Sequence, residues 1–166
     1  MVFNKKGLSM VVSAMILVAI VIALTGIVWI SIDKLVNEEL DKSEACFLVL
    51  DKTQFNDAYT CYNLSKSKMQ FSIEVKDINI EELIISITME NSSRTFTMYN
   101  ESRNITGLTN YPLGTNNVKL PGQNRGKTYF ASEVDAFPSS IEIAPKINGI
   151  QCEISDSIFD IQDCSQ

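Results

Sequence analysis

The residues best suited to covalent chemistry in this chain are four cysteines, Cys46, Cys61, Cys152 and Cys164. An even number of cysteines in a chain segment outside the cytosol indicates disulfide bonds, and four cysteines allow three pairings. They fall into two local pairs, each closing a loop of roughly a dozen residues. We therefore predict Cys46–Cys61 and Cys152–Cys164, each stabilising the fold by about 3 kcal/mol in the loop-entropy model. A zinc site is the alternative, but no two cysteines have C-x-x-C spacing.

Other residue types give little support for catalysis. The chain has no histidine, which removes the commonest general base and the commonest metal ligand. Its glycines form no phosphate-binding motif. Glu153, Asp156, Asp160 and Asp163 gather near the C-terminus, but their spacing matches no EF-hand loop, so we expect a solvated acidic face and no metal. A net charge of −6 argues against nucleic acid. We expect neither enzymatic activity nor a cofactor.

Modification of asparagine is a further chemical feature. Four Asn-X-Ser/Thr sequons begin at Asn63, Asn91, Asn100 and Asn104. Each is a candidate N-glycosylation site if it lies on the outer side of a membrane. The last three are close together in the sequence, which would place sugar along one edge of the folded domain.

A long apolar segment decides which side of a membrane these residues occupy. Residues 8–32 contain no charged side chain, and this run of 25 residues exceeds the ~20 needed for a membrane-spanning helix. Two lysines precede the run, and acidic residues predominate immediately after it. Because lysine and arginine are enriched on the cytoplasmic side, the N-terminus should lie in the cytoplasm and the rest of the chain outside.

The start of the apolar segment carries a recognisable junction. The run is too long for an ordinary secretory signal, and the sequence Lys5-Lys6-Gly7-Leu8-Ser9 precedes it. This arrangement resembles the class III signal of type IV pilin-like proteins, most closely that of archaeal pilins and archaellins. Val12 stands where bacterial pilins usually have Glu, and Met10 where many archaeal members have Pro. The resemblance covers about 40 residues and implies that a membrane peptidase, recognising Lys5, Lys6, Gly7 and Leu8, cuts between Gly7 and Leu8.

After that cut, the apolar segment would remain as an assembly helix. We expect one helix over residues 8–45, since no proline interrupts it. Trp29 near its outer end suits a membrane interface. Small residues allow close approach between helices, and they recur in the apolar part at Ser9, Ser13, Ala19, Ala23 and Gly26.

Beyond residue 45 the hydrophobic period changes from helix to strand. Apolar and polar residues alternate over residues 69–75 and 83–89, which is typical of half-buried strands. Asn148-Gly149 predicts a two-residue hairpin turn. Residues 102–123 are rich in Asn, Thr, Gly and Pro and are expected to form an exposed connection. Further strands are expected over residues 94–99, 127–131 and 141–143.

These patterns predict an α+β chain: a leader (residues 1–7), a long hydrophobic helix (8–45) and a small antiparallel β-sheet or sandwich ectodomain (46–166). The resemblance implies a structural subunit of an archaeal type IV pilus-like filament, inserted in the membrane first and extracellular after assembly. Its partners would be copies of itself or related pilins, the prepilin peptidase and the assembly machinery. The alternatives are a single-span anchor that displays a β-domain as a surface binding module, and a minor pilin-like component.

Overall fold

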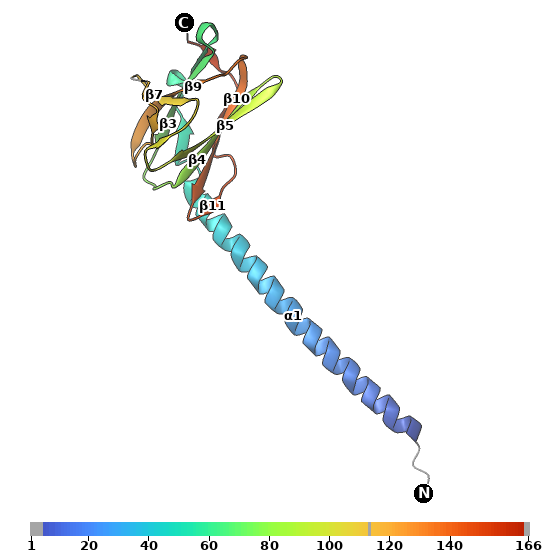
Figure 1. The fold of residues 1–166 in the computed structure, drawn as a ribbon. Helices are drawn as coiled ribbons and strands as arrows, with labels where there is room; N and C mark the ends of the chain where they lie inside the picture. The colour runs from blue at the N-terminus through green and yellow to red at the C-terminus, as the bar shows by residue number, and fades with distance from the viewer. Residues whose placement is uncertain (1–4, 113, 165–166) are drawn as a thin grey trace. The chain divides into compact units, whose positions relative to one another are not determined.

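The computed structural model describes residues 5–112 and 114–164, with side chains from residue 11 onward. It contains one long helix, α1 (Lys5–Val49), followed by a domain built mainly of antiparallel strands (Figure 1). The predicted α+β class is confirmed at this level. Contacts divide the chain between Asp41 and Lys42, so the last two turns of α1 belong to the same compact unit as the strands.

Helix α1 extends four residues beyond its expected end at residue 45. Residues 8–49 contain no proline and a single glycine, Gly26, whose cost within a helix is only about 1 kcal/mol. The helix stops where the chain enters a turn at Asp51, which has a left-handed backbone (φ 60°). The amide of Lys52 donates to the carbonyl of Val49 at 3.0 Å, which satisfies one of the helix's last acceptors.

The first sheet has six strands, five of which follow the order β13-β2-β3-β9-β7. The sixth, β1, pairs with the last residues of β3, whereas β2 pairs with its first residues. Its pairings are antiparallel except that between β13 and β2. The strands are β1 (Thr53–Phe55), β2 (Cys61–Asn63), β3 (Lys68–Val75), β7 (Leu108–Asn110), β9 (Arg125–Ser132) and β13 (Gln162–Asp163). Two 3₁₀ turns flank β2: η1 (Asp57–Tyr59) and η2 (Leu64–Lys66).

The second sheet has five strands in the order β11-β10-β4-β5, with β12 also pairing with β10. All its pairings are antiparallel. The strands are β4 (Glu82–Met89), β5 (Ser92–Tyr99), β10 (Pro138–Ile147), β11 (Ile150–Gln151) and β12 (Asp156–Ile158). A separate pair joins β6 (Arg103–Asn104) to β8 (Asn117–Val118).

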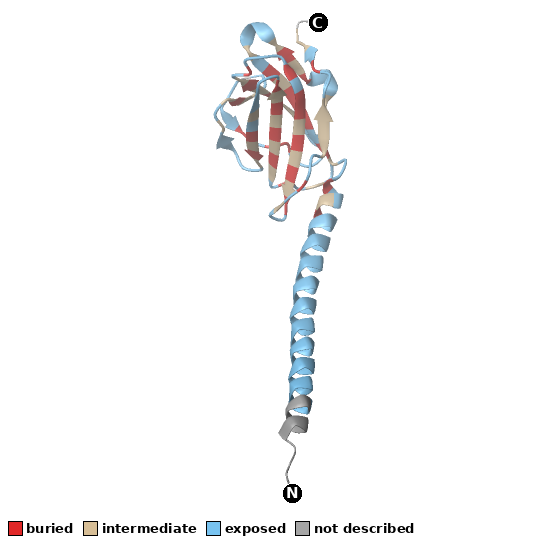
Figure 2. Cartoon of the chain, turned by 90° about the vertical axis from the view of Figure 1, so that its right-hand side faces the viewer, coloured by how far each residue is buried: buried red, intermediate tan, exposed pale blue. Residues whose placement is uncertain are grey.

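Inward-facing residues of the two sheets form one hydrophobic cluster. Buried and more exposed positions alternate along the strands (Figure 2), because successive side chains of a strand point to opposite faces. The predicted alternation is confirmed in β3, where Met69, Phe71 and Ile73 are fully buried, and in β4, where Leu83, Ile85 and Ile87 are fully buried.

Two turn regions that the sequence singled out differ in outcome. The Asn148-Gly149 turn is confirmed: Ile147 pairs with Ile150, and both turn residues have positive φ, 51° and 74°. Residues 102–123 are not simply an exposed connection, as predicted. They contain three short strands, and Leu108, Val118 and Leu120 are buried in the core. These three residues are separated by 10 and 2 positions and therefore give no periodic signal. The prediction relied on the polar composition of the segment and was wrong for this reason.

Candidate functional site

The most conspicuous surface of the chain is the apolar part of α1. Every described side chain from residue 11 to residue 44 is exposed. Among the described residues, one helix is long and apolar enough to cross a membrane, and it lies near the N-terminus. The uncharged residues 11–32 span ~33 Å at 1.5 Å per residue, which matches the ~30 Å hydrocarbon core of a bilayer.

Two hydroxyl groups within this helix are bonded to the helix's own carbonyls. The Thr25 hydroxyl donates to the Val21 carbonyl at 2.8 Å, and the Ser31 hydroxyl donates to the Ile27 carbonyl at 3.0 Å. Hydroxyls bonded in this way to the preceding turn need no water. Both residues can therefore lie among lipid chains or neighbouring helices without an unsatisfied donor.

The small residues of the helix lie on more than one face. Ala19, Ala23 and Gly26 are spaced four and three apart and form one stripe, whereas Ser13 lies about a third of a turn away from Ala19. A Cβ atom added at Gly26 would meet nothing within 4 Å. No contact among the described residues therefore requires glycine at this position.

The predicted peptidase junction lies at the beginning of α1. The backbone is helical from Lys5, so Lys5, Lys6, Gly7 and Leu8 all belong to the helix. Their side chains, and that of Ser9, lie outside the part of the chain that the structure describes. Cleavage between Gly7 and Leu8 therefore stays a prediction.

The last turns of α1 are packed and covalently attached to the β domain. Ala45 and Val49 are buried in a small cluster with Ile147 and Cys152. Cys46 forms a disulfide with Cys152, and their Cα atoms are 5.3 Å apart. The end of the helix is thereby fixed to the β10–β11 hairpin, which lies about 100 residues later in the chain.

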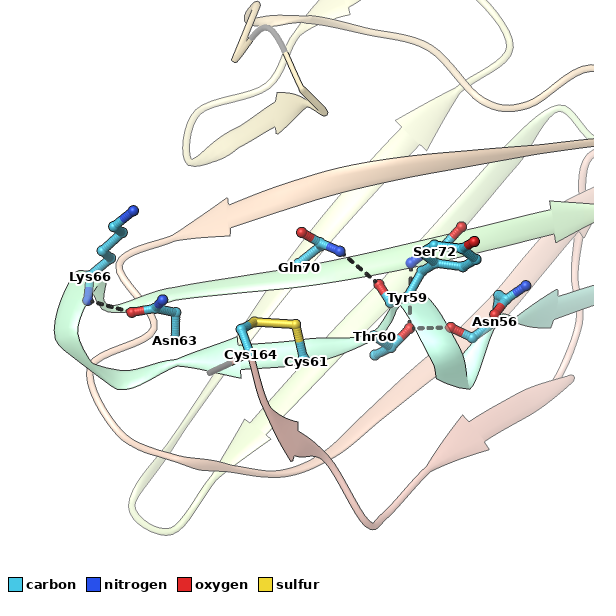
Figure 3. The surroundings of a disulfide bond; sticks show 9 residues. All are labelled: Asn56, Tyr59, Thr60, Cys61, Asn63, Lys66, Gln70, Ser72 and Cys164. Atoms are coloured by element: carbon cyan, nitrogen blue, oxygen red, sulfur yellow. Dashed lines mark hydrogen bonds between the residues drawn. A yellow bond between two sulfur atoms is a disulfide. The ribbon is translucent and has the colours of Figure 1, made fainter. Parts of the chain in front are cut away.

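The predicted disulfide pairing, Cys46–Cys61 and Cys152–Cys164, is wrong. Besides Cys46–Cys152, the structure pairs Cys61 with Cys164 (Figure 3). Parallel pairing of β13 with β2 places Gln162 opposite Cys61 and brings Cys164 alongside. Closing a separation of 106 residues instead of 15 costs only about 2 kcal/mol more entropy. Strand pairing therefore outweighs proximity along the chain.

The four sequons occupy different environments. Asn91, Asn100 and Asn104 are exposed, and the first two lie at opposite ends of the edge strand β5. Asn63 is half-buried, and its side-chain oxygen accepts a hydrogen bond from the Lys66 amide at 3.1 Å. Asn91, Asn100 and Asn104 are therefore the more accessible sites, while glycosylation itself stays a prediction.

One of the C-terminal acidic residues, Asp156, has a structural role. The carboxylate of Asp156 accepts hydrogen bonds from the amides of Phe55 (2.7 Å) and Ser157 (2.9 Å). Within residues 5–112 and 114–164, no three His, Cys, Asp or Glu side chains are arranged to hold a metal ion. Asp156 therefore stabilises the contact between β1 and β12.

Two buried tyrosines have shifted pKa values for structural reasons. Burial raises the pKa of both Tyr62 and Tyr129 above its ordinary value. The Tyr62 hydroxyl donates to the Val134 carbonyl at 2.6 Å, and the Tyr129 hydroxyl donates to the Lys119 carbonyl at 2.7 Å. Both phenols are thus held protonated within the fold and are not poised for proton transfer.

A pocket of mixed polar and apolar lining on the outer face of the first sheet was missed by the sequence analysis. It has a volume of about 330 Å³, and its lining includes Asn63 from β2, Gln70 from β3 and Phe130 from β9. The polar positions of the strand alternation are the signal that could have revealed it. Alternation alone does not show which strands are neighbours, so these residues could not be brought together.

Comparison with protein family models, with characterised proteins and with solved structures gives no match for this chain.

Proposed function

We propose that the protein is a structural subunit of an archaeal type IV pilus-like surface filament. The observation that carries this proposal is the uninterrupted exposure of the apolar helix surface over residues 11–32. Apolar area of this extent is unfavourable in water and must be covered by lipid or by other helices. A filament core of packed helices covers it, and a membrane covers it before assembly.

Assembly would move the helix from lipid into a bundle. Apolar surface is buried to a similar extent in lipid and in a helix bundle. The free-energy difference between the two states therefore depends on close packing between helices. The stripe of Ala19, Ala23 and Gly26 offers a surface at which backbones can approach. In this proposal, removal of residues 1–7 by a prepilin peptidase precedes assembly, and the pilus machinery and other copies of the chain are the partners.

The β domain would lie outside the cell in both states. Both disulfides lie in the unit that follows residue 41, and disulfides persist in oxidising compartments. Three exposed sequons are in the same unit. A single membrane span with a cytoplasmic N-terminus is consistent with this arrangement before assembly, and an extracellular filament is consistent with it afterwards.

A second candidate is a permanent single-span anchor that displays the domain as a surface binding module. The observation that favours it is the pocket on the outer face of the first sheet. This candidate requires neither peptidase processing nor a helix bundle.

Fractionation of cells distinguishes the two candidates. Surface filaments are sheared from cells, separated from membranes and imaged by electron microscopy, and this chain is quantified in both fractions by mass spectrometry. A filament subunit is recovered in sheared filaments and disappears from them when its gene is deleted. Recovery in the membrane fraction alone, with filaments unchanged by the deletion, would favour the permanent anchor.

A further inference from the structure

The pocket on the first sheet is lined by outward-facing residues of three neighbouring strands, together with Lys66 from the η2 turn and Cys164 just after β13. In the strand register, Cys61 is opposite Gln70, Asn63 is opposite Lys68, and Gln70 is opposite Phe130. These residues alternate with the buried Tyr62, Met69 and Tyr129, so they share the face directed away from the core. Strand pairing therefore brings most of the pocket's lining residues together.

The charge at this pocket is opposite to that of the whole protein. Lys66 and Lys68 are the charged residues in its lining, and none of its lining residues is acidic. Among the described residues, neither lysine ammonium has an ion pair or a hydrogen bond. In a chain of net charge −6, two lysines that line the same pocket and have no ion pair among the described residues favour an anion at this place.

The remaining groups suit a hydroxylated ring. The Gln70 amide nitrogen donates to the Tyr59 carbonyl at 3.3 Å (Figure 3), and no described residue bonds its oxygen. The Phe130 ring lines the pocket, and the Tyr111 ring continues this aromatic surface, with ring centroids 5.4 Å apart. Amides bind hydroxyl groups, and an aromatic face covers apolar C–H groups.

We propose that this pocket binds an acidic saccharide through one uronate ring. The carboxylate would pair with Lys66 and Lys68, the hydroxyl groups would bond Asn63 and Gln70, and the C–H face of the ring would lie on Phe130. The pocket's volume of about 330 Å³ is at the small end of the ~300–1,000 Å³ range of ligand sites, which fits one sugar ring. This binding goes beyond the proposed filament role and does not depend on assembly.

The test uses the full chain in non-ionic detergent micelles, titrated with tetragalacturonate and, separately, with the neutral maltotetraose. Isothermal calorimetry gives the affinity, and NMR of the side-chain amides reports on Asn63 and Gln70. The proposal predicts binding of tetragalacturonate with shifts of both amides, weakening as salt is raised because screening acts on exposed charges. Maltotetraose should bind at least about tenfold more weakly.

A matched pair of variants assigns this binding to the pocket. Lys66→Gln/Lys68→Gln should weaken tetragalacturonate binding by about tenfold. The control Lys76→Gln/Lys119→Gln removes the same charge at exposed positions and should leave the affinity unchanged. Lys76 lies eight residues beyond Lys68, ~26 Å along an extended strand. Near-ultraviolet circular dichroism verifies that each variant is folded.

The proposal would be overturned by no binding of tetragalacturonate, by equal binding of maltotetraose, or by equal loss of affinity in both double variants. Acetate that displaces tetragalacturonate at equal concentration would show a simple anion site and would also overturn it. None of these results bears on filament assembly, because the measurement is made on dispersed chains.

Discussion

Cys46, near the end of the long helix, is bonded to Cys152 just beyond the β10–β11 hairpin, with 5.3 Å between their Cα atoms. The two residues are 106 positions apart in the sequence. The bond therefore encloses most of the β domain and lowers the conformational entropy of the unfolded chain by about 2 kcal/mol more than a local loop would.

Removing this bond should destabilise the domain. We expect Cys46→Ser/Cys152→Ser to lower the free energy of unfolding by about 4–5 kcal/mol and Tm by about 15 °C, measured by circular dichroism in mild detergent. Hydrogen exchange should increase first at Ala45 and Val49, which pack beside the bond. A non-reducing peptide map that links Cys46 to Cys61 would contradict this arrangement.

The β10–β11 turn provides a test of backbone conformation separate from packing. Gly149 has φ +74°, and an added Cβ there would meet nothing within 4 Å. Gly149→Ala should therefore cost about 1 kcal/mol through left-handed strain alone. The control is Gly122→Ala, whose Cβ would meet only the Arg125 side chain at an ordinary 3.8 Å. Equal unfolding free energies for the two variants in urea titrations would contradict the assigned turn.

Stability should fall at alkaline pH. Burial raises the pKa of Tyr62 and Tyr129 in the folded chain, so folding retains protons that the unfolded chain releases near pH 10. The stability that the two protonated phenols contribute is fully present below about pH 10 and is lost as the pH rises above it.

The Tyr129→Phe variant isolates one of these protons. Burial and Lys119 lower the pKa of the nearby Lys127. This shift changes the free energy of unfolding with pH in the opposite direction, but it is the same in the wild type and the variant. Urea unfolding between pH 9 and 11 should show a shallower decline in Tyr129→Phe, by up to about 1.4 kcal/mol per pH unit. Identical slopes in the two proteins would refute the buried-phenol explanation.

The small-residue stripe of α1 should matter for assembly and not for folding. We expect Ala23→Leu to insert in membranes and retain a folded β domain but to yield few or no filaments, because the larger side chain separates adjacent helices. Leu24→Ile, which conserves volume next to it, should assemble normally. Electron microscopy of sheared filaments gives the readout, and wild-type yields for Ala23→Leu would exclude this stripe from the helix contacts.

Local patterns predicted the elements well, and long-range pairing could not be predicted from them. Alternation of period two located β3 and β4, because each strand buries one face. The absence of proline and charge predicted the helix. Cys61–Cys164 was missed because the parallel contact between β13 and β2 joins segments about 100 residues apart, and β13 has only two residues, too few for a periodic signal.

The same limit explains the missed pocket. Asn63, Lys68 and Gln70 were visible as polar positions, but Phe130 joins them only through the pairing of β3 with β9. The peptidase junction is the opposite case, since its residues are adjacent in the sequence and need no tertiary structure to be recognised.

The central claim is most directly tested at the N-terminus of the mature protein. Protein isolated from membranes and from sheared filaments is digested, and its N-terminal peptide is identified by mass spectrometry. The proposal predicts a chain that begins at Leu8 in the filament fraction. Filament protein that retains residues 1–7 would contradict processing, and a chain found only in membranes with residues 1–7 retained would favour a permanent anchor for the β domain.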